Sequence, residues 1–235
     1  MSFNKYPLGG LKCCIASNRY GTYCVPQSSA HRPAAQAILK ENVWEPHTIE
    51  LVCAKCADGD IIHAGTYFGD FLPAFSRALR GGRRVWAFEP NPENHLCADV
   101  TMRINNLANV VLTNAALGED SGKLSMAVSD GSGRALGGAS RVVKTEDIRS
   151  KISIDVVSLD EAVPPDRNIS VIQLDVEGFE LQALKGAIGT IRRCKPHLIL
   201  ETLPSDGWIA ENLYGLGYAL SGHVHVNAVL SPQKP

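Results

Sequence analysis

Acidic side chains follow the ends of several short apolar runs in this 235-residue sequence. They are Glu89 after residues 85–88, Asp175 and Glu177 after residues 171–174, and Glu201 after residues 197–200. Each acid alone could be a helix cap. The carboxyl ends of parallel strands share one edge of an α/β sheet, and ligands bind outside that edge, so four carboxylates there indicate a common site. Such carboxylates can accept hydrogen bonds from ribose hydroxyls, or can orient or deprotonate a substrate hydroxyl.

A glycine-containing turn follows the apolar run at 61–64. The residues that we expect to hold a ligand there are His63, Gly65, Thr66, Tyr67, Gly69 and Asp70. Two glycines four residues apart allow a close approach of the backbone to a ligand, although an ordinary strand-to-helix turn has the same pattern. A dinucleotide fingerprint, G-x-G-x-x-G, would place Tyr67 and Asp70 at its second and third glycines. A ring and a carboxylate at these points disfavour NAD or FAD, and favour a ligand with a carboxylate and no phosphate.

The elements that must position these residues alternate along the chain. Apolar runs typical of buried strands lie at 61–64, 85–88, 110–112, 154–157, 171–174 and 197–200, and helical spacing is found at 33–41, 46–57, 71–79, 93–104 and 179–191. This alternation predicts an α/β protein with a mostly parallel, Rossmann-like sheet and right-handed crossovers. We also expect a hairpin through 124–128 after the third strand, and a terminal antiparallel pair at 218–221 and 225–230.

Four sequence blocks occur in an order that resembles the FkbM family of methyltransferases, over residues 45–201. The blocks are Gly65-x-x-x-Gly69-Asp70, Ala87-Phe-Glu-Pro-Asn-Pro-Glu-Asn94, Asn114-Ala-Ala-Leu-Gly118 and Asp175-Val-Glu-Gly-x-Glu180. The resemblance implies a class I methyltransferase fold, S-adenosylmethionine as the methyl donor, and O-methylation of a hydroxyl on a sugar, polyketide or similar natural product. The chain departs from the family at His63, because the family's glycine loop usually begins with an acidic residue.

The resemblance and the strand-end rule together suggest a role for each site residue. Gly65 and Gly69 would contact the methionine part of the donor, Glu89 its ribose, and Asn114 and Ala115 the region beside adenine, while Pro90 would fix the loop that presents Glu89. Asp175 or Glu177 would orient or deprotonate the acceptor, Asp175 would also contact the donor, and His31 is a weaker candidate for the base. His223 and His225 lie in the terminal hairpin, and we expect them far from the donor site.

A segment rich in glycine and serine, residues 129–141, has too few apolar side chains to pack on itself, so we expect it to be mobile without ligand. It could close over the acceptor, in which case Arg134 and Arg141 favour an anionic acceptor, or it could be an exposed loop without a role. We divide the chain into an N-terminal extension or cap, residues 1–44, and a methyltransferase domain, residues 45–235.

Composition narrows the class of protein further. The formal net charge of −1 gives no general attraction to nucleic acid or to an anionic membrane surface, and no apolar stretch is long enough to span a bilayer. Seven scattered cysteines favour reduced thiols in the cytoplasm. The pair Cys53-x-x-Cys56 lacks the further ligands of a zinc site. We expect no metal either at Asp175 and Glu177, because no clear third ligand lies in that segment.

We therefore predict an S-adenosylmethionine-dependent methyltransferase that acts on a small-molecule hydroxyl, and the chain could form a homodimer. One alternative is an adenosine-ligand-binding or scaffold domain that is catalytically weak or silent. A short-chain reductase is disfavoured, because no tyrosine has a lysine four residues later.

Overall fold

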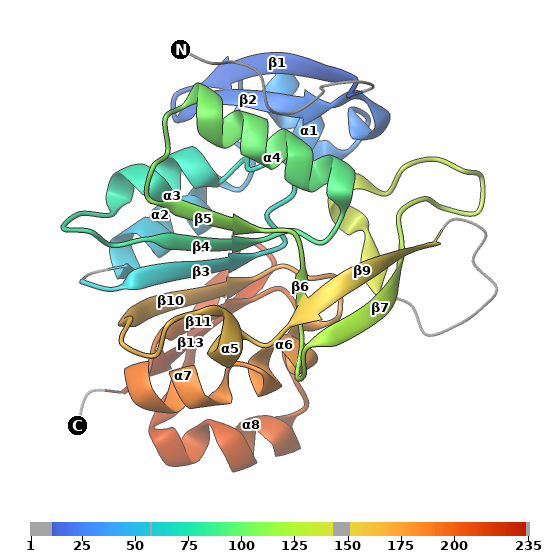
Figure 1. Cartoon of the computed structure of the whole chain (residues 1–235). Coiled ribbons are helices and arrows are strands. Elements are labelled where there is room, and N and C mark those ends of the chain that lie inside the picture. Colours follow the sequence, from blue (N-terminus) through green and yellow to red (C-terminus); the bar gives the residue numbers. More distant parts are fainter. Residues whose placement is uncertain (1–10, 57, 143–150, 234–235) are drawn as a thin grey trace.

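A seven-stranded sheet forms the centre of the protein in this computed structural model, which describes residues 11–56, 58–142 and 151–233 (Figure 1). Its order is β12-β13-β11-β10-β3-β4-β5. The bounds are β3 Asp60–Ala64, β4 Val85–Phe88, β5 Val110–Thr113, β10 Ile169–Leu174, β11 His197–Leu200, β12 Tyr218–Val224 and β13 Asn227–Pro232. The first five are mutually parallel, and β12 and β13 form an antiparallel pair beside β11. The predicted Rossmann-like sheet with a terminal antiparallel hairpin is confirmed.

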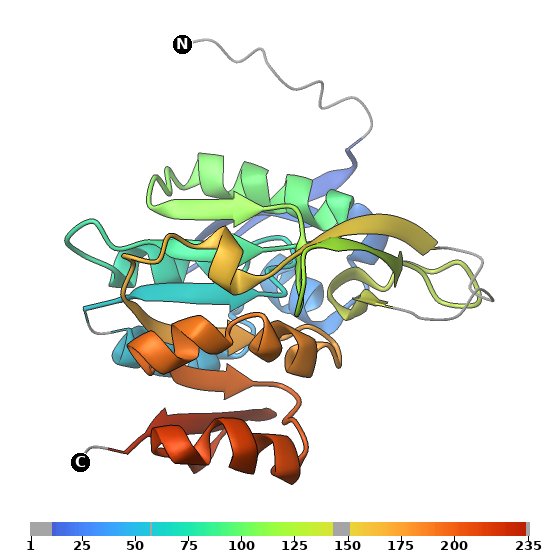
Figure 2. The ribbon, with the colours of Figure 1, turned by 60° about the horizontal axis from the view of Figure 1, so that its bottom comes forward.

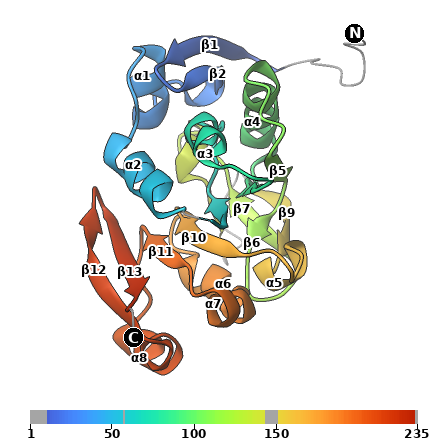
Figure 3. The same cartoon turned by 90° about the vertical axis from the view of Figure 1, so that its left-hand side faces the viewer.

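Helices cover both faces of this sheet, as Figure 3 shows from one end of the strands. One face carries α2 (Pro46–Lys55) and α3 (Leu72–Ala78), and the other carries α5 (Leu159–Ala162), α6 (Glu180–Lys185), α7 (Ile188–Cys194) and α8 (Asp206–Asn212). Successive strand residues point to opposite faces. Ile61, Val171 and Ile199 therefore pack on the α2 and α3 side, and their neighbours Ile62, Ile172 and Leu200 on the other.

The helix expected at 179–191 is interrupted. It is divided into α6 and α7 around Gly186. A Cβ atom on Gly186 would lie 1.9 Å from the carbonyl oxygen of Gly118, so this glycine permits two backbones to meet. The interruption comes from a contact between distant segments, which helical spacing in the sequence does not reveal.

A second, four-stranded sheet lies past the carboxyl ends of the parallel strands (Figure 2). Its order is β6-β9-β7-β8, with bounds β6 Ala116–Leu117, β7 Gly122–Ala127, β8 Arg141–Val142 and β9 Lys151–Val157. The strand expected at 124–128 is β7, which pairs antiparallel with β8 and β9. The alternating pattern located the strand, but its partner β9 begins more than twenty residues later.

The N-terminal segment forms a small layer against α4 (Pro92–Ile104). It contains the antiparallel strands β1 (Cys13–Asn18) and β2 (Gly21–Pro26), a short 3-10 helix at Gln27–Ser29, and α1 (Pro33–Leu39). Tyr23, Ile38 and Phe68 are buried together between these elements. The division at residue 44 stays a prediction, and residues 1–10 of the predicted extension lie outside the described part of the chain.

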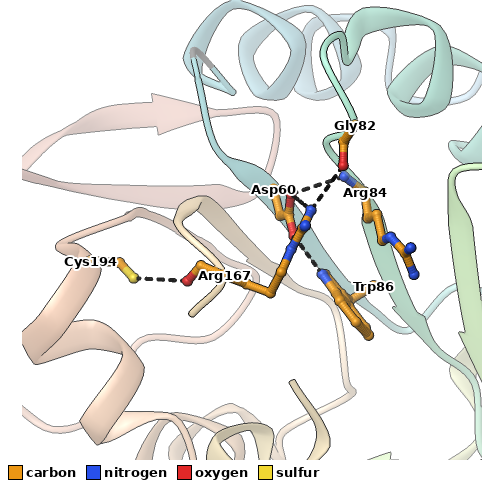
Figure 4. A network of polar contacts seen from close by, with 6 residues as sticks. All are labelled: Asp60, Gly82, Arg84, Trp86, Arg167 and Cys194. Carbon is orange, nitrogen blue, oxygen red and sulfur yellow. Dashed lines mark hydrogen bonds and ion pairs between the residues drawn. The ribbon is translucent and has the colours of Figure 1, made fainter. Parts of the chain in front are cut away.

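A buried carboxylate closes the amino ends of the strands, the edge opposite the site (Figure 4). Asp60 is 1% exposed and accepts hydrogen bonds from Arg84 N at 2.9 Å, Trp86 Nε1 at 2.8 Å and Arg167 Nε at 2.7 Å. Its other Arg167 contact, to Nη2, is 2.6 Å. These contacts join β3 and β4 to the loop that precedes β10.

Within the described ranges, no helix combines the length and apolarity needed to cross a membrane.

Candidate functional site

Two adjoining cavities lie at the carboxyl ends of β3, β4, β10 and β11. The larger, of about 280 Å³, is here called the acidic cavity, because its wall includes Glu45, Asp70, Asp175, Glu177 and Glu201 beside Arg32, Trp44, His63, Tyr67 and His225. The smaller, of about 30 Å³, is called the apolar cavity and is lined by Phe88, Pro90, Ala116, Leu117, Met126, Val176 and Phe179 with Glu89 at its wall. Gly65, Gly138 and Asp175 line both. The two cavities therefore meet at these three residues.

In the turn after β3, main-chain atoms and no side chain line the place where the two cavities meet. Gly65 has φ +84°, and a Cβ atom there would lie 1.7 Å from the carbonyl oxygen of Asp175. The amides of Gly65 and Thr66 both donate to the carbonyl oxygen of Phe88, at 3.1 and 3.2 Å. Thr66 is buried, and its hydroxyl donates to His63 O. Only glycine fits at Gly65, whereas Thr66 and Gly69 shape the turn without lining either cavity.

Glu89 connects the end of β4 to this turn. It is 4% exposed and accepts hydrogen bonds from Tyr67 N at 2.7 Å and Asn91 N at 2.9 Å, and a longer one from Asn94 Nδ2 at 3.4 Å. Burial raises the pKa of Glu89 to about 7, although these donors oppose the shift. A carboxylate offers about four lone-pair sites, so acceptor capacity remains beside the apolar cavity.

Asn114 and Ala115 line neither cavity among the described residues. The side chain of Asn114 donates to Glu89 O at 2.7 Å and to Pro90 O at 3.2 Å, so it holds the loop in which Glu89 lies. The small residue that reaches the apolar cavity is Ala116, where β6 begins. The segment was identified by the sequence, but the start of β6 decides which of its residues faces the cavity.

Three carboxylates gather on one side of the acidic cavity. One oxygen each from Asp175, Glu177 and Glu201 lies within 4.8 Å of the others. Burial, followed by the charge of Glu201, raises the pKa of Asp175 well above its usual range and also raises the pKa of Glu177. A group with a raised pKa is a better match for proton transfer near neutral pH than an ordinary aspartate.

His63 lies beneath these acids, at the end of β3. It is 2% exposed, its ring stacks on Phe71 at 5.6 Å between centroids, and its Nδ1 hydrogen bonds to Gln173 Oε1. Burial lowers the pKa of His63 to about 4, so the ring is neutral at physiological pH. Its Nε2 finds no hydrogen-bond partner in the part of the chain that the structure describes.

The histidine predictions need correction. His31 is not in the wall of either cavity among the described residues, and its neighbour Arg32 is. His225, expected far away, lines the acidic cavity, and its Nδ1 lies 3.1 Å from Glu45 Oε1. Because β13 runs antiparallel to β11, the turn that precedes β13 lies at the carboxyl end of β11. No local pattern marks Glu45 or His225 as site residues.

Backbone strain also concentrates at the acidic cavity. Seven non-glycine residues in the described ranges have positive φ, and four of them line this cavity: Glu45, Tyr67, Glu177 and His225. Such conformations cost on the order of 1–3 kcal/mol each and persist where the surrounding structure holds them, often at active sites. The strain supports placing the functional site here.

Comparison with known proteins identifies the family of the chain. The family model described as a methyltransferase FkbM domain matches residues 63–228, more than half of the chain. Among solved structures, the FkbM methyltransferase from Methylobacillus flagellatus has a TM-score of 0.52 and 20% identity, over 74% of this chain and 43% of that one. This likeness shows the fold, and the chain spans less than half of that relative.

Two further solved structures are more distant. A SAM-dependent methyltransferase from Aquifex aeolicus has a TM-score of 0.46 and 14% identity, over 87% of this chain and 96% of that one. The tRNA (uracil-54, C5)-methyltransferase of Pyrococcus abyssi, in complex with S-adenosyl-L-homocysteine, has a TM-score of 0.47 and 12% identity, over 93% and 43%. No curated protein matches the sequence.

Proposed function

Because this chain belongs to the FkbM family of S-adenosylmethionine-dependent methyltransferases, we propose that it transfers a methyl group to a hydroxyl oxygen of a small molecule. The observation that carries the proposal is the pair of cavities that meet at Gly65, Gly138 and Asp175. One is narrow and apolar, as a nucleoside base requires, and the other is polar and acidic, as an acceptor with several hydroxyls requires.

The residues of the apolar cavity fit the nucleoside half of S-adenosylmethionine. Pro90, Leu117 and Phe179 offer flat or apolar surface, and Glu89 accepts ribose hydroxyls with its remaining lone pairs. The present volume of about 30 Å³ is smaller than a nucleoside. Gly138, Ser140 and Val142 form part of this wall, and an outward movement of this segment would enlarge the cavity for the donor. The predicted role of the 129–141 segment as a cover is consistent with that movement.

The residues at the junction fit the charged half of the donor. The carboxylates of the acidic cavity favour a positive sulfonium electrostatically, and the neutral His63 presents an unpartnered ring nitrogen in the same wall. Gly65 keeps the junction free of side chain. We assign the methionine end of the donor to this region, with Tyr67 and Asp70 beside it.

The chemistry requires alignment more than acid or base strength. When bound, S-adenosylmethionine supplies an electrophilic methyl group whose bond to sulfur breaks as the new O–C bond forms. Asp175, with its raised pKa, accepts the proton of the acceptor hydroxyl as that bond forms, and Glu177 holds the hydroxyl in line. Asp175 lines both cavities, and Glu177 lines the acidic cavity.

Donor binding is tested by calorimetry with S-adenosylmethionine. Glu89→Ala should weaken binding at least about tenfold, because each charge-assisted hydrogen bond contributes roughly 1.5–3 kcal/mol. Glu211→Ala, an exposed glutamate on α8, is the matched control and should bind as the wild type does. Equal affinity of Glu89→Ala and the wild type would remove Glu89 from the site.

The competing function is a donor-binding domain without turnover, which the replacement of the family's acid by His63 favours. Incubation with labelled donor and a panel of sugars and other alcohols distinguishes the two. Label in an alcohol product supports the transferase, whereas tight donor binding with no labelled product from any alcohol supports the silent domain.

A further inference from the structure

The strand register places four polar side chains on one face of the sheet, at the carboxyl ends of three adjacent strands. His63 aligns with Gln173 in the β3–β10 register, and Gln173 aligns with Ile199 in the β10–β11 register. Because side chains two residues apart share a face, Asp175 and Glu201 lie one layer above His63 and Gln173. The residues below them on this face, such as Ile61, are buried and apolar. The apolar core of this face therefore ends in a polar layer.

The acidic residues of this layer carry more negative charge than the nearby arginines can neutralise. Glu177 completes the group with Asp175 and Glu201, and the three carboxylate oxygens lie within 4.8 Å of one another. Arg32 and Arg141 stabilise the charge of Glu177, but the charges that act on Asp175 are all acidic. Three carboxylates held this close require either shared protons or a cation.

A separate observation points to a ligand at this place. His63 is 2% exposed and lies in the wall of the same cavity, and its Nε2 lacks a hydrogen-bond partner among the described residues. Since Nδ1 of His63 faces the Gln173 oxygen, Nε2 carries the free lone pair and needs a donor such as a metal-bound water.

We propose that Asp175, Glu177 and Glu201 bind one hard divalent cation, of the Mg²⁺ or Mn²⁺ type, and that the acceptor's hydroxyl oxygen binds to the open side of this cation. The second half rests on the proposed function. Carboxylate oxygens are the ligands that such cations prefer, and a cation that binds an oxygen also lowers the pKa of its proton. With the cation bound, Asp175 and Glu177 serve as its ligands instead of as the base and the positioning group, and the hydroxyl proton passes to another carboxylate of the acidic cavity or to solvent as the methyl group arrives.

The dimensions match those of a divalent metal site. Oxygens on opposite sides of one ion lie at most about 4 Å apart for Mg²⁺, bound at about 2.0–2.1 Å, and about 5 Å apart for Ca²⁺, bound at up to about 2.6 Å. The three oxygens lie within 4.8 Å of one another, so a small contraction is enough for them to bind Mg²⁺. The expectation of metal independence rested on the absence of a clear third ligand in the sequence segment that contains Asp175 and Glu177. In the fold, the adjacent strand β11 supplies Glu201.

Titration of the chelator-treated full chain with MnCl₂, followed by the electron paramagnetic resonance signal of free Mn²⁺, tests the site. The wild type should bind one Mn²⁺ per chain, and Mg²⁺ should displace it. Glu201→Gln should weaken Mn²⁺ binding at least about tenfold, whereas Glu211→Gln, on the surface of α8, should not change it. Absence of saturable binding by the wild type, or equal binding by Glu201→Gln, would overturn the proposal.

The folded state of each variant is checked by circular dichroism, and Asp175→Asn provides a second variant should Glu201→Gln fail to fold. Calorimetry with S-adenosylmethionine in the presence of chelator separates this proposal from the proposed function. Mn²⁺ binding without donor binding would retain the cation site and reject the methyltransferase assignment. Donor binding without Mn²⁺ binding would retain the methyltransferase assignment and reject the cation site.

Discussion

Replacement of Asp60 by alanine should destabilise the protein without changing the donor site. Asp60 is 1% exposed and accepts four hydrogen bonds from the Arg84 amide, Trp86 and Arg167 (Figure 4). Alanine removes the acceptor of three donor groups, the Arg84 amide, the buried Trp86 indole N–H and the partly exposed Arg167 guanidinium. Because the network closes the amino ends of β3 and β4, and the cavities lie at the opposite ends, the loss should appear in stability and not in ligand affinity.

The magnitude follows from the exposure of each partner. Trp86 is 8% exposed, so its unpaired Nε1–H should cost about 1–3 kcal/mol. Breaking a buried ion pair costs about 3–5 kcal/mol, but the Arg167 side chain is 25% exposed and can recover part of its hydration. We expect a total loss of about 4 kcal/mol, which corresponds to a Tm lower by roughly 10 °C in a chain of this size.

The assay is urea unfolding followed by circular dichroism and by tryptophan fluorescence, with Asp155→Ala as the matched control. Asp155 forms an ion pair with Lys123, but both side chains are more than half exposed, so that control should lose less than about 1 kcal/mol. A loss below about 1 kcal/mol for Asp60→Ala, equal to that of the control, would refute the reasoning. So would a change in S-adenosylmethionine affinity of the folded Asp60→Ala variant.

Three other predictions concern the site itself. Gly65→Ala places a Cβ atom 1.7 Å from Asp175 O at a residue with positive φ, so we expect at least about 2 kcal/mol of destabilisation and weaker donor binding. The control is Gly131→Ala, whose Cβ atom would meet nothing within 4 Å. Equal urea unfolding midpoints for the two variants would contradict this prediction. Replacement of residues 133–138 by a short Gly-Ser link should reduce methyl transfer far more than donor affinity, because Gly138 lines both cavities; unchanged turnover would show that the segment is only surface. His63 has a pKa lowered by burial to about 4, so the folded state binds fewer protons than the unfolded state between about pH 4 and 6.5, and the stability that His63 contributes is lost as the pH falls through this window. The stability advantage of the wild type over His63→Gln should therefore shrink by about 3 kcal/mol between pH 7 and pH 4 in urea titrations, and a pH-independent difference would contradict a buried neutral imidazole.

Features of the sheet that depend on local alternation could be predicted from the sequence. Apolar runs such as 85–88 and 197–200 match β4 and β11, because a buried parallel strand needs little more than a short apolar run between polar boundaries. The strand-end rule then placed Glu89, Asp175 and Glu177 in the walls of the cavities, since that rule depends on topology and not on side-chain detail.

Features that depend on contacts between distant segments could not be predicted from the sequence. The break at Gly186 exists because Gly118 lies against it, and β7 pairs with β9 across a long connection. Two residues that line the acidic cavity, Glu45 and His225, were not predicted from the sequence. Glu45 lies in a loop before the family's sequence blocks, and His225 lies in a turn after them. Glu45 Oε1 contacts His225, and its Oε2 accepts hydrogen bonds from Thr48 and Asn227, so this pair joins the start of α2 to the terminal hairpin.

The contact between Glu45 and His225 bears on which acceptor the cavity can hold. Glu45 and His225 both have positive φ, and both stand on the side of the acidic cavity formed by elements outside the β4 to β10 framework. In the proposed function, the turn after β3 and Glu89 would hold the donor, and α2 and the β12–β13 turn would border the acceptor. Changes at residues 45 and 225 can therefore alter the shape of the acceptor space while leaving Gly65 and Glu89 in place. Variation in acceptor should follow these two segments and not the sequence blocks by which the family is identified.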